Sequence, residues 1–135
     1  MSASIRHIAL IVRDPARTAD LFAGVLGAQV IAEQPDDEGH PQTFAKFGGV
    51  WFVLRQGEGP PARNGDHIGF EVSRDELRDY ADKLATYDVE HFMAREHTAL
   101  YFMDYDNHVF ELDAGGSIDD ALGACLTSLR SPRSA

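Results

Sequence analysis

Two halves of this chain open with the same pattern, a histidine followed by an apolar segment that has the character of a β-strand. His7 precedes IALIV, and His67 precedes IGFEV. In each half a helix pattern comes next, followed by three further strand candidates, so the order βαβββ occurs twice. Such a repeat predicts an α+β fold in which two equivalent modules build one pseudo-symmetric, barrel-like sheet.

Turn-forming residues divide the repeat into segments. We expect the first βαβββ module over residues 1–56, a linker rich in glycine and proline over 57–65, and the second module over 66–115. A C-terminal helix and tail should follow over 116–135. All four segments are expected to belong to one structural domain, because the chain has the length of a single ordinary domain.

Both predicted helices carry signals at their ends. Asp14 followed by Pro15 indicates the start of the first helix, and Gly27 indicates its end. Ser73 and Glu76 have the spacing of a capping box in front of the second helix. Each helix is therefore expected to lie between the first and second strands of its own module.

Net charge limits the partners of the protein. The 135 residues carry a formal charge of −10, with acidic residues spread along the chain. Such a surface repels phosphate backbones and anionic lipids, so nucleic acids and membranes are not expected partners. A single cysteine excludes an intrachain disulfide, and no apolar run approaches the roughly 20 residues needed to cross a bilayer. We therefore expect a cytoplasmic protein.

Two of the six histidines occupy equivalent places in the repeat. His7 shares a strand face with Ala9 and Ile11, and His67 shares one with Gly69, because side chains alternate along a strand. A histidine that points into a small barrel needs a partner for its ring nitrogens. Two histidines related by the repeat could point at one centre, which makes both of them candidate metal ligands.

The final strand pattern, HVFELD, supplies a third candidate ligand. Glu111 shares a face with Val109, whereas His108 and Phe110 point the other way and His108 is interpreted as structural. A carboxylate among apolar neighbours is stable in a half-buried strand when a cation holds it there. Two imidazoles and one carboxylate suit Mn²⁺, Fe²⁺, Zn²⁺, Ni²⁺ or Co²⁺ and leave coordination positions open for water or substrate.

Three segments of the chain resemble the vicinal-oxygen-chelate superfamily. They are HIALIVRD, DHIGFEV and YFMDYDNHVFEL, and the resemblance extends from residue 5 to about residue 122. The superfamily includes glyoxalase I, extradiol dioxygenases, bleomycin-resistance proteins and fosfomycin-resistance enzymes. The run 104–108, together with Gly49-Val50-Trp51, is most similar to the fosfomycin-resistance branch that hydrates the epoxide.

The resemblance implies the ligand set and the assembly. It places the ligands of one divalent metal ion per site on His7, His67 and Glu111. It also implies a homodimer, in which His7 of one chain joins His67 and Glu111 of the other. Tyr101, ten residues before Glu111, matches a tyrosine of the family and is the expected catalytic residue, a hydrogen-bond donor to a metal-bound oxygen.

The expected substrate-binding residues match the family less well. They are Trp51, Gln42 and Arg95, with Lys46 as a further cation for a phosphonate. Gln42 stands where the epoxide-hydrolysing branch carries a general-base glutamate, and an amide cannot accept a proton at neutral pH. Glu38 is the nearby carboxylate that could replace it. Ala9 and Ala121 also stand where the family pattern has a threonine and an arginine, which argues against fosfomycin itself as the substrate.

These features predict a metal-dependent lyase, hydrolase or transferase that acts on a small oxygen-bearing molecule such as an epoxide or a phosphonate. One alternative is an extradiol-type dioxygenase with Fe²⁺, in which His91 or His97 would be the acid–base residue. Another is a drug-binding protein of the bleomycin-resistance type without catalysis. The acidic net charge favours this alternative, whereas the candidate metal ligands argue against it. Glyoxalase I chemistry needs a further carboxylate from the first module, where Gln42 stands.

Overall fold

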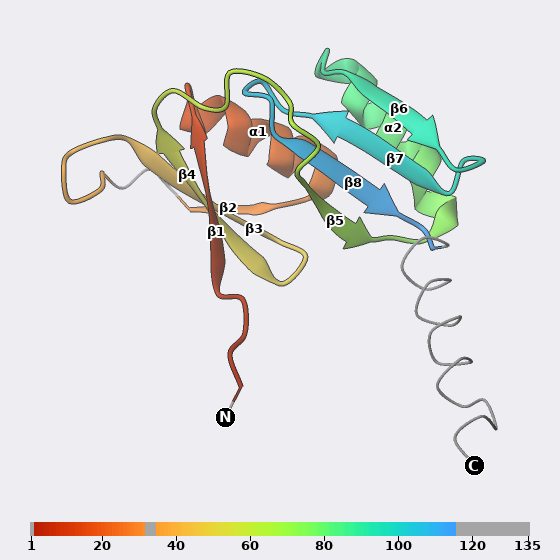
Figure 1. Ribbon diagram of the computed structural model, residues 1–135, viewed down its shortest axis with the longest axis horizontal. Helices are drawn as coiled ribbons and strands as arrows, with labels where there is room; N and C mark the ends of the chain where they lie inside the picture. Colours follow the sequence, from red (N-terminus) through yellow and green to blue (C-terminus); the bar gives the residue numbers. More distant parts are fainter. Residues whose placement is uncertain (1, 32–34, 116–135) are drawn as a thin grey trace.

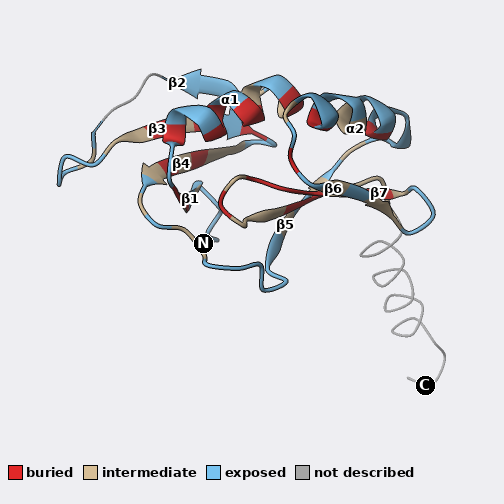
Figure 2. Ribbon diagram, turned by 90° about the horizontal axis from the view of Figure 1, so that it is seen from above, coloured by how far each residue is buried: buried red, intermediate tan, exposed pale blue. Residues whose placement is uncertain are grey.

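The computed structural model describes residues 2–31 and 35–115, and these form two four-stranded mixed sheets with two helices. Both helices lie on the same side of the sheets (Figure 2), and within these two ranges the strand faces opposite them carry no helix (Figure 1). The elements are β1 (His7–Val12), α1 (Pro15–Leu26), β2 (Gln29–Ile31), β3 (Gln42–Phe47), β4 (Val50–Gln56), β5 (His67–Glu71), a 3₁₀ turn (Arg74–Glu76), α2 (Leu77–Thr86), β6 (His91–Ala94), β7 (Ala99–Met103) and β8 (Val109–Asp113).

The two sheets repeat each other in strand order and in register. The first has the order β1-β4-β3-β2, and the second has the order β5-β8-β7-β6. In both, the opening strand pairs in parallel with the last strand of its module, so that His7 lies opposite Trp51 and His67 lies opposite Val109. The prediction of two βαβββ modules in an α+β fold is therefore confirmed.

The end of α1 and the starts of both helices follow the predicted signals. The Asp14 carboxylate accepts a hydrogen bond from the backbone N–H of Arg17 at 3.1 Å, and Pro15 takes the first helical position. Gly27 ends the helix in the left-handed conformation at φ 68°. In front of α2, the Glu76 carboxylate accepts from the backbone N–H of Ser73 at 3.0 Å and from its hydroxyl at 2.8 Å.

Aromatic rings between the sheets and α1 join the two modules. Phe22 of α1 is fully buried and makes edge-to-face contacts with Phe47, Phe52 and Phe110, at centroid distances of 5.2, 5.8 and 5.4 Å. Two of these partners belong to the first sheet and Phe110 belongs to the second. One side chain therefore ties both sheets to the same helix, which fixes the sheets in one core.

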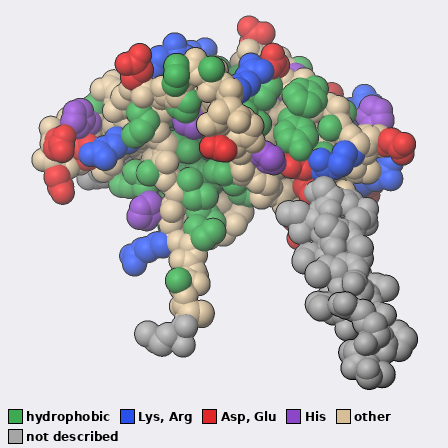
Figure 3. All heavy atoms as spheres, viewed as in Figure 1, with side chains coloured by type: hydrophobic (Ala, Val, Ile, Leu, Met, Phe, Trp, Pro, Cys, Tyr) green, Lys and Arg blue, Asp and Glu red, His purple; other side chains and the backbone are tan. Residues whose placement is uncertain are grey.

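The faces opposite the helices are only partly covered within one chain. Phe92 on β6 is 52% exposed, and Ile31 on β2 is 42% exposed. Figure 3 shows apolar side chains gathered around the strands of the first sheet on this side. Within the described residues, α1 and α2 thus cover one side of the sheets and leave these faces open.

The C-terminal helix and tail that the sequence predicts over 116–135 lie outside the described residues, and so do Ala121 and the single cysteine, Cys125. Across the part of the chain that the structure does describe, no helix is long and apolar enough to cross a membrane.

The aromatic core gives a direct test of the fold. Replacing Phe22 by alanine should lower the free energy of unfolding by about 3–5 kcal/mol, because the lost ring leaves a cavity between both sheets and α1. Phe22→Leu keeps most of the volume and should cost clearly less. Urea denaturation of the three proteins measures the difference. A loss below about 1 kcal/mol for Phe22→Ala would contradict this account of the core.

Candidate metal centre

The side chains of His67, Tyr101 and Glu111 lie on the same open face of the second sheet. In the register of β5, β8 and β7, Gly69 pairs with Glu111 and Tyr101 pairs with Glu111. Residues paired in this way project from the same face, and His67 lies two residues before Gly69 on that face. A side chain added at Gly69 would meet no atom within 4 Å, so the surface beside Glu111 is open.

His67 presents one ring nitrogen to Glu111. Its Nδ1 lies 3.0 Å from the carbonyl oxygen of Gly65, which only accepts, so Nδ1 carries the hydrogen and donates it. Its Nε2 lies 3.1 Å from Oε1 of Glu111. In a neutral imidazole with this tautomer, the Nε2 lone pair would face the carboxylate oxygen directly. A cation between the two groups removes that repulsion, and a backbone-anchored Nδ1 is the usual arrangement of a metal-binding histidine.

Glu111 is the most buried charged group of the site. Its side chain is 7% exposed on the central strand β8, where a carboxylate is unfavourable without a partner. Besides His67, its partner is Arg95 from the turn between β6 and β7, which donates from Nη2 to Oε2. The Glu111 carboxylate, followed by the Tyr101 hydroxyl, raises the pKa of the Arg95 guanidinium above its usual range, so Arg95 stays charged.

Tyr101 is held beside these groups by its ring and its hydroxyl. The ring stacks on Phe92 at 5.4 Å between centroids and meets the edge of the His67 ring at 5.6 Å. Nη1 of Arg95 donates to the hydroxyl oxygen at 3.2 Å. A guanidinium has no acceptor, so the hydroxyl keeps its own hydrogen to donate elsewhere. Tyr101 therefore lies beside Glu111 with its hydroxyl oxygen accepting from Arg95 and its hydroxyl hydrogen left to donate.

His7 does not reach this group within one chain. It lies on β1, which belongs to the other sheet, and it is exposed. Among the described residues, no three histidine, cysteine, aspartate or glutamate side chains gather as a metal site. The repeat explains why His7 also lacks a carboxylate of its own: Ala9 pairs with Val53, so Val53 takes the place that Glu111 has in the second sheet.

The other predicted substrate-binding residues lie with His7 on the first sheet. Gln42, Lys46 and Trp51 belong to β3 and β4, and register places them on the face that carries His7. Lys46 extends its ammonium over the Trp51 ring, 5.6 Å from the centroid. Of the predicted site residues, the structure brings together His67, Glu111, Tyr101 and Arg95. The others, His7, Gln42 and Trp51, lie in the first module.

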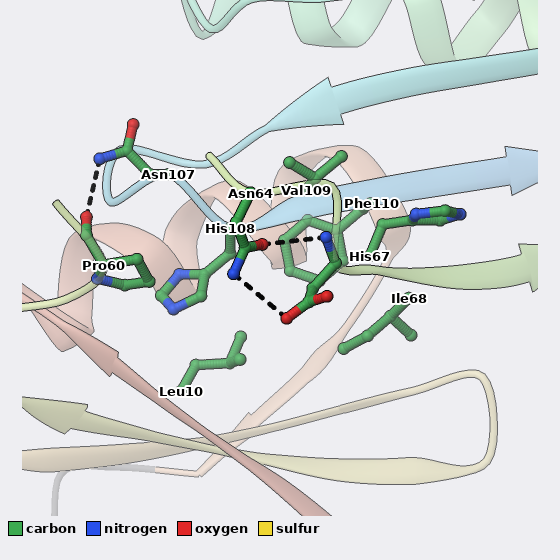
Figure 4. A pocket seen from close by; sticks show the side chains of 10 residues that line it. Leu10, Pro60, Asn64, His67, Ile68, Asn107, His108, Val109 and Phe110 are labelled. Atoms are coloured by element: carbon green, nitrogen blue, oxygen red, sulfur yellow. Dashed lines mark hydrogen bonds between the residues drawn. The ribbon is translucent and has the colours of Figure 1, made fainter. Parts of the chain in front are cut away.

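A cavity of about 220 Å³ lies beside the start of β5 (Figure 4). Leu10 of the first sheet and Phe110 of the second contribute to its wall, and His67 and His108 line it. Nδ1 of His108 is 2.7 Å from the buried carboxylate of Asp104, which fits the structural role expected for this histidine.

The turn before β8 explains why the run 104–108 has such a specific pattern. Asp104 accepts hydrogen bonds from the backbone N–H groups of Asp106 and His108, at 2.8 and 2.9 Å, and Asn107 adopts the left-handed conformation at φ 71°. Asp106 accepts from Nε of Arg13 at 2.8 Å, which ties this turn to the first module. The polar residues of the motif therefore fix the turn that sets the position of Glu111.

Comparison with known proteins agrees with this fold. The profile of the Glyoxalase/Bleomycin resistance protein/Dioxygenase superfamily matches residues 4–112. The chain belongs to this superfamily, and the resemblance inferred from the three segments is confirmed at the level of the family.

Curated relatives lie among the fosfomycin-resistance proteins. The fosfomycin resistance protein FosX of Listeria innocua is 31% identical over 122 residues, covering 85% of this chain and 92% of the relative. The metallothiol transferase FosB of Staphylococcus epidermidis is 27% identical over 131 residues, covering 90% of each.

Solved structures of these proteins share the fold. FosX from Mesorhizobium loti has a TM-score of 0.80 at 27% identity and covers 90% of this chain and 99% of its own. A variant of FosX from Listeria monocytogenes, complexed with Mn(II) and 1S,2S-dihydroxypropylphosphonic acid, has a TM-score of 0.76 at 30% identity. It covers 89% of this chain and 98% of its own.

The buried carboxylate gives a testable consequence for stability. Glu111→Gln keeps the shape of the side chain but removes the charge that pairs with Arg95, so the metal-free protein should lose about 1–3 kcal/mol. Glu71→Gln, on an exposed end of β5, is the matched control and should change stability by less than about 0.5 kcal/mol. Chemical denaturation in the presence of a chelator compares them. Equal stability of both variants would contradict the role given to Glu111.

Proposed function

We propose that the protein is a divalent-metal-dependent enzyme of the glyoxalase and fosfomycin-resistance type that acts on a small epoxide, phosphonate or similar molecule. The observation that carries the proposal is the facing pair of His67 Nε2 and Glu111 Oε1 at 3.1 Å, with Nδ1 of the histidine already committed to a backbone carbonyl. Relatives that are named metallothiol transferases, or that were crystallised with Mn(II), support the same chemistry. Mn²⁺ is therefore the first metal to test.

The third protein ligand is proposed to be His7 of the partner subunit. His7 has the same place in the first sheet as His67 has in the second, and it is exposed on a face that neither α1 nor α2 covers. A two-fold dimer that sets the open first sheet of one chain against the open second sheet of the other would complete two equal sites. The homodimer and the placement in the cytoplasm are part of this proposal.

The bound metal would act as a Lewis acid on an oxygen of the substrate. Tyr101 would donate its hydroxyl hydrogen to an oxygen held beside Glu111. Gln42, Lys46 and Trp51 share a face with His7, so they would enter the site with it and contact the rest of the substrate. Gln42 cannot act as a general base, so a nucleophile that does not rely on that position, such as a thiol, is favoured over water.

The structure gives a reason to place the dioxygenase alternative second. His91 pairs with Phe102, which puts it on the face opposite Tyr101 and Glu111, and its Nδ1 is 2.9 Å from the carbonyl oxygen of Val89. His97 lines a cavity with His91 beside α2. His91 therefore does not lie on the face that carries Glu111, and His97 shares the cavity of His91. The non-catalytic drug binder is disfavoured by the facing pair of His67 and Glu111.

Metal content and turnover test the proposal together. Purified protein loaded with Mn²⁺ should bind one ion per chain, and His67→Ala should lose it while remaining folded. His40→Ala, in an exposed loop, is the control and should keep the ion. The loaded protein is then assayed with fosfomycin, used as a test epoxide, together with water, glutathione or other thiols. Any thiol addition is expected to exceed hydration. Full metal occupancy in His67→Ala would refute the site, and faster hydration than thiol addition would refute the role given to Gln42.

A mixed dimer tests whether the site is shared. Neither His7→Ala nor His67→Ala alone should bind the metal tightly. A heterodimer of the two variants would have one site with both histidines replaced and one site with both intact, so it should bind half as much metal as the wild-type dimer. Differently tagged chains allow the heterodimer to be purified and its metal measured. No recovery of binding would show that His7 and His67 do not meet across an interface.

A further inference from the structure

The turn between β6 and β7 has an unusual backbone that directs Arg95 to Glu111. Arg95, Glu96 and His97 all have positive φ, at 47°, 55° and 65°, although none of them is glycine. Such residues each carry a strain of roughly 1–2 kcal/mol. The backbone N–H of Thr98 bonds to the carbonyl of Ala94 at 3.2 Å, and its hydroxyl donates to the carbonyl of Arg95 at 2.6 Å. The turn is thus held closed with Arg95 at its start.

From this turn the Arg95 guanidinium contacts three groups at once. Nη2 donates to Oε2 of Glu111 and lies 3.3 Å from Oδ1 of Asp113, and Nη1 donates to the Tyr101 hydroxyl. The side chain is 33% exposed, so one flank of the guanidinium is sheltered by the site and the other meets solvent. Arg95 therefore links the candidate metal ligand to the candidate catalytic residue.

The two oxygens of Glu111 have different partners. Oε1 faces His67 Nε2, whereas Oε2 is taken by Arg95. A cation that binds between His67 and Glu111 can therefore use Oε1 while Arg95 keeps Oε2. Arg95 also places a positive charge beside the position of the metal, which lowers the attraction of the site for a second cation.

We propose that Arg95 is a positioning residue, which restricts Glu111 to one-oxygen metal binding, weakens metal affinity and directs the Tyr101 hydroxyl hydrogen towards the substrate. This inference rests on the proposed metal site. It differs from the phosphonate-binding role that the sequence suggested for Arg95, because the guanidinium already contacts Glu111, Asp113 and Tyr101. A metal bound by one oxygen of Glu111 would receive less electron density than a metal bound by both oxygens, so it would be the stronger Lewis acid.

The test compares metal affinity in four full-length proteins. Arg95→Gln should bind Mn²⁺ about tenfold more tightly than wild type, because the competing cation is removed and Oε2 becomes free. Arg95→Lys retains the charge but loses the forked contacts, so its affinity should lie between those of wild type and Arg95→Gln. Arg63→Gln removes a different arginine–carboxylate pair, with Glu90, and should leave the affinity unchanged. Titration followed by the electron paramagnetic resonance of free Mn²⁺ measures all four.

Two further readouts separate positioning from a purely structural role. The absorption spectrum of bound Co²⁺ should change in Arg95→Gln, because a second carboxylate oxygen enters the coordination sphere. The metal-free variant should unfold at a lower temperature than wild type, and saturating Mn²⁺ should raise its Tm by more than it raises that of wild type. A variant that folds only with Mn²⁺ present would also support the inference.

The possible failures are distinguishable. Equal or weaker Mn²⁺ binding by Arg95→Gln, with the wild type binding one ion per chain, would overturn the inference and leave the proposed function standing. An Arg95→Gln variant that is unfolded with and without Mn²⁺ would also overturn it, because Arg95 would then serve the fold and not the metal. Absence of binding in all four proteins would overturn the metal site and this inference with it.

Discussion

The burial of one carboxylate on a central strand is the constraint on which the site depends. Glu111 lies between β5 and β7, flanked by buried phenylalanine and leucine, and its side chain is almost entirely covered. A carboxylate in that position must be matched by positive charge or by hydrogen-bond donors. The second module supplies that charge through Arg95, which donates to Oε2, while His67 turns its Nε2 towards Oε1. Arg95 therefore offsets part of the cost of burying Glu111, and the oxygen that faces His67 is placed where it could bind a cation.

The comparison of the two modules shows why one metal is expected for each pair of modules. Both sheets have the same strand order and the same register, and both begin with a histidine. The carboxylate, however, occurs only in the second sheet, because the equivalent place in the first is Val53. The first sheet instead carries Gln42, Lys46 and Trp51 on the face of its histidine. In the proposed site, one module would provide the ligand pair, and the other would provide a single ligand together with polar and aromatic side chains for a substrate.

Much of this architecture could be predicted from the sequence, because the relevant signals are local. Asp14, Gly27 and the Ser73–Glu76 capping box each determine a helix end through contacts within a few residues. Strand alternation correctly separated Glu111 from His108. The separation of His7 from the pair of His67 and Glu111 within one chain could not be derived from alternation, since it depends on how the two sheets are placed. The contacts of Arg95 were also missed, because they depend on three successive left-handed residues for which the sequence has no glycine signal.

The central claim is that one divalent metal is bound jointly by two chains. The most direct measurement is a crystal structure of the full chain grown with Mn²⁺, with data collected to locate the anomalous scattering of manganese. The account predicts one manganese peak per chain, within bonding distance of His67 Nε2 and Oε1 of Glu111 and of His7 of the partner subunit. It would be contradicted by a peak bound without His7, or by full Mn²⁺ loading with no peak between His67 and Glu111.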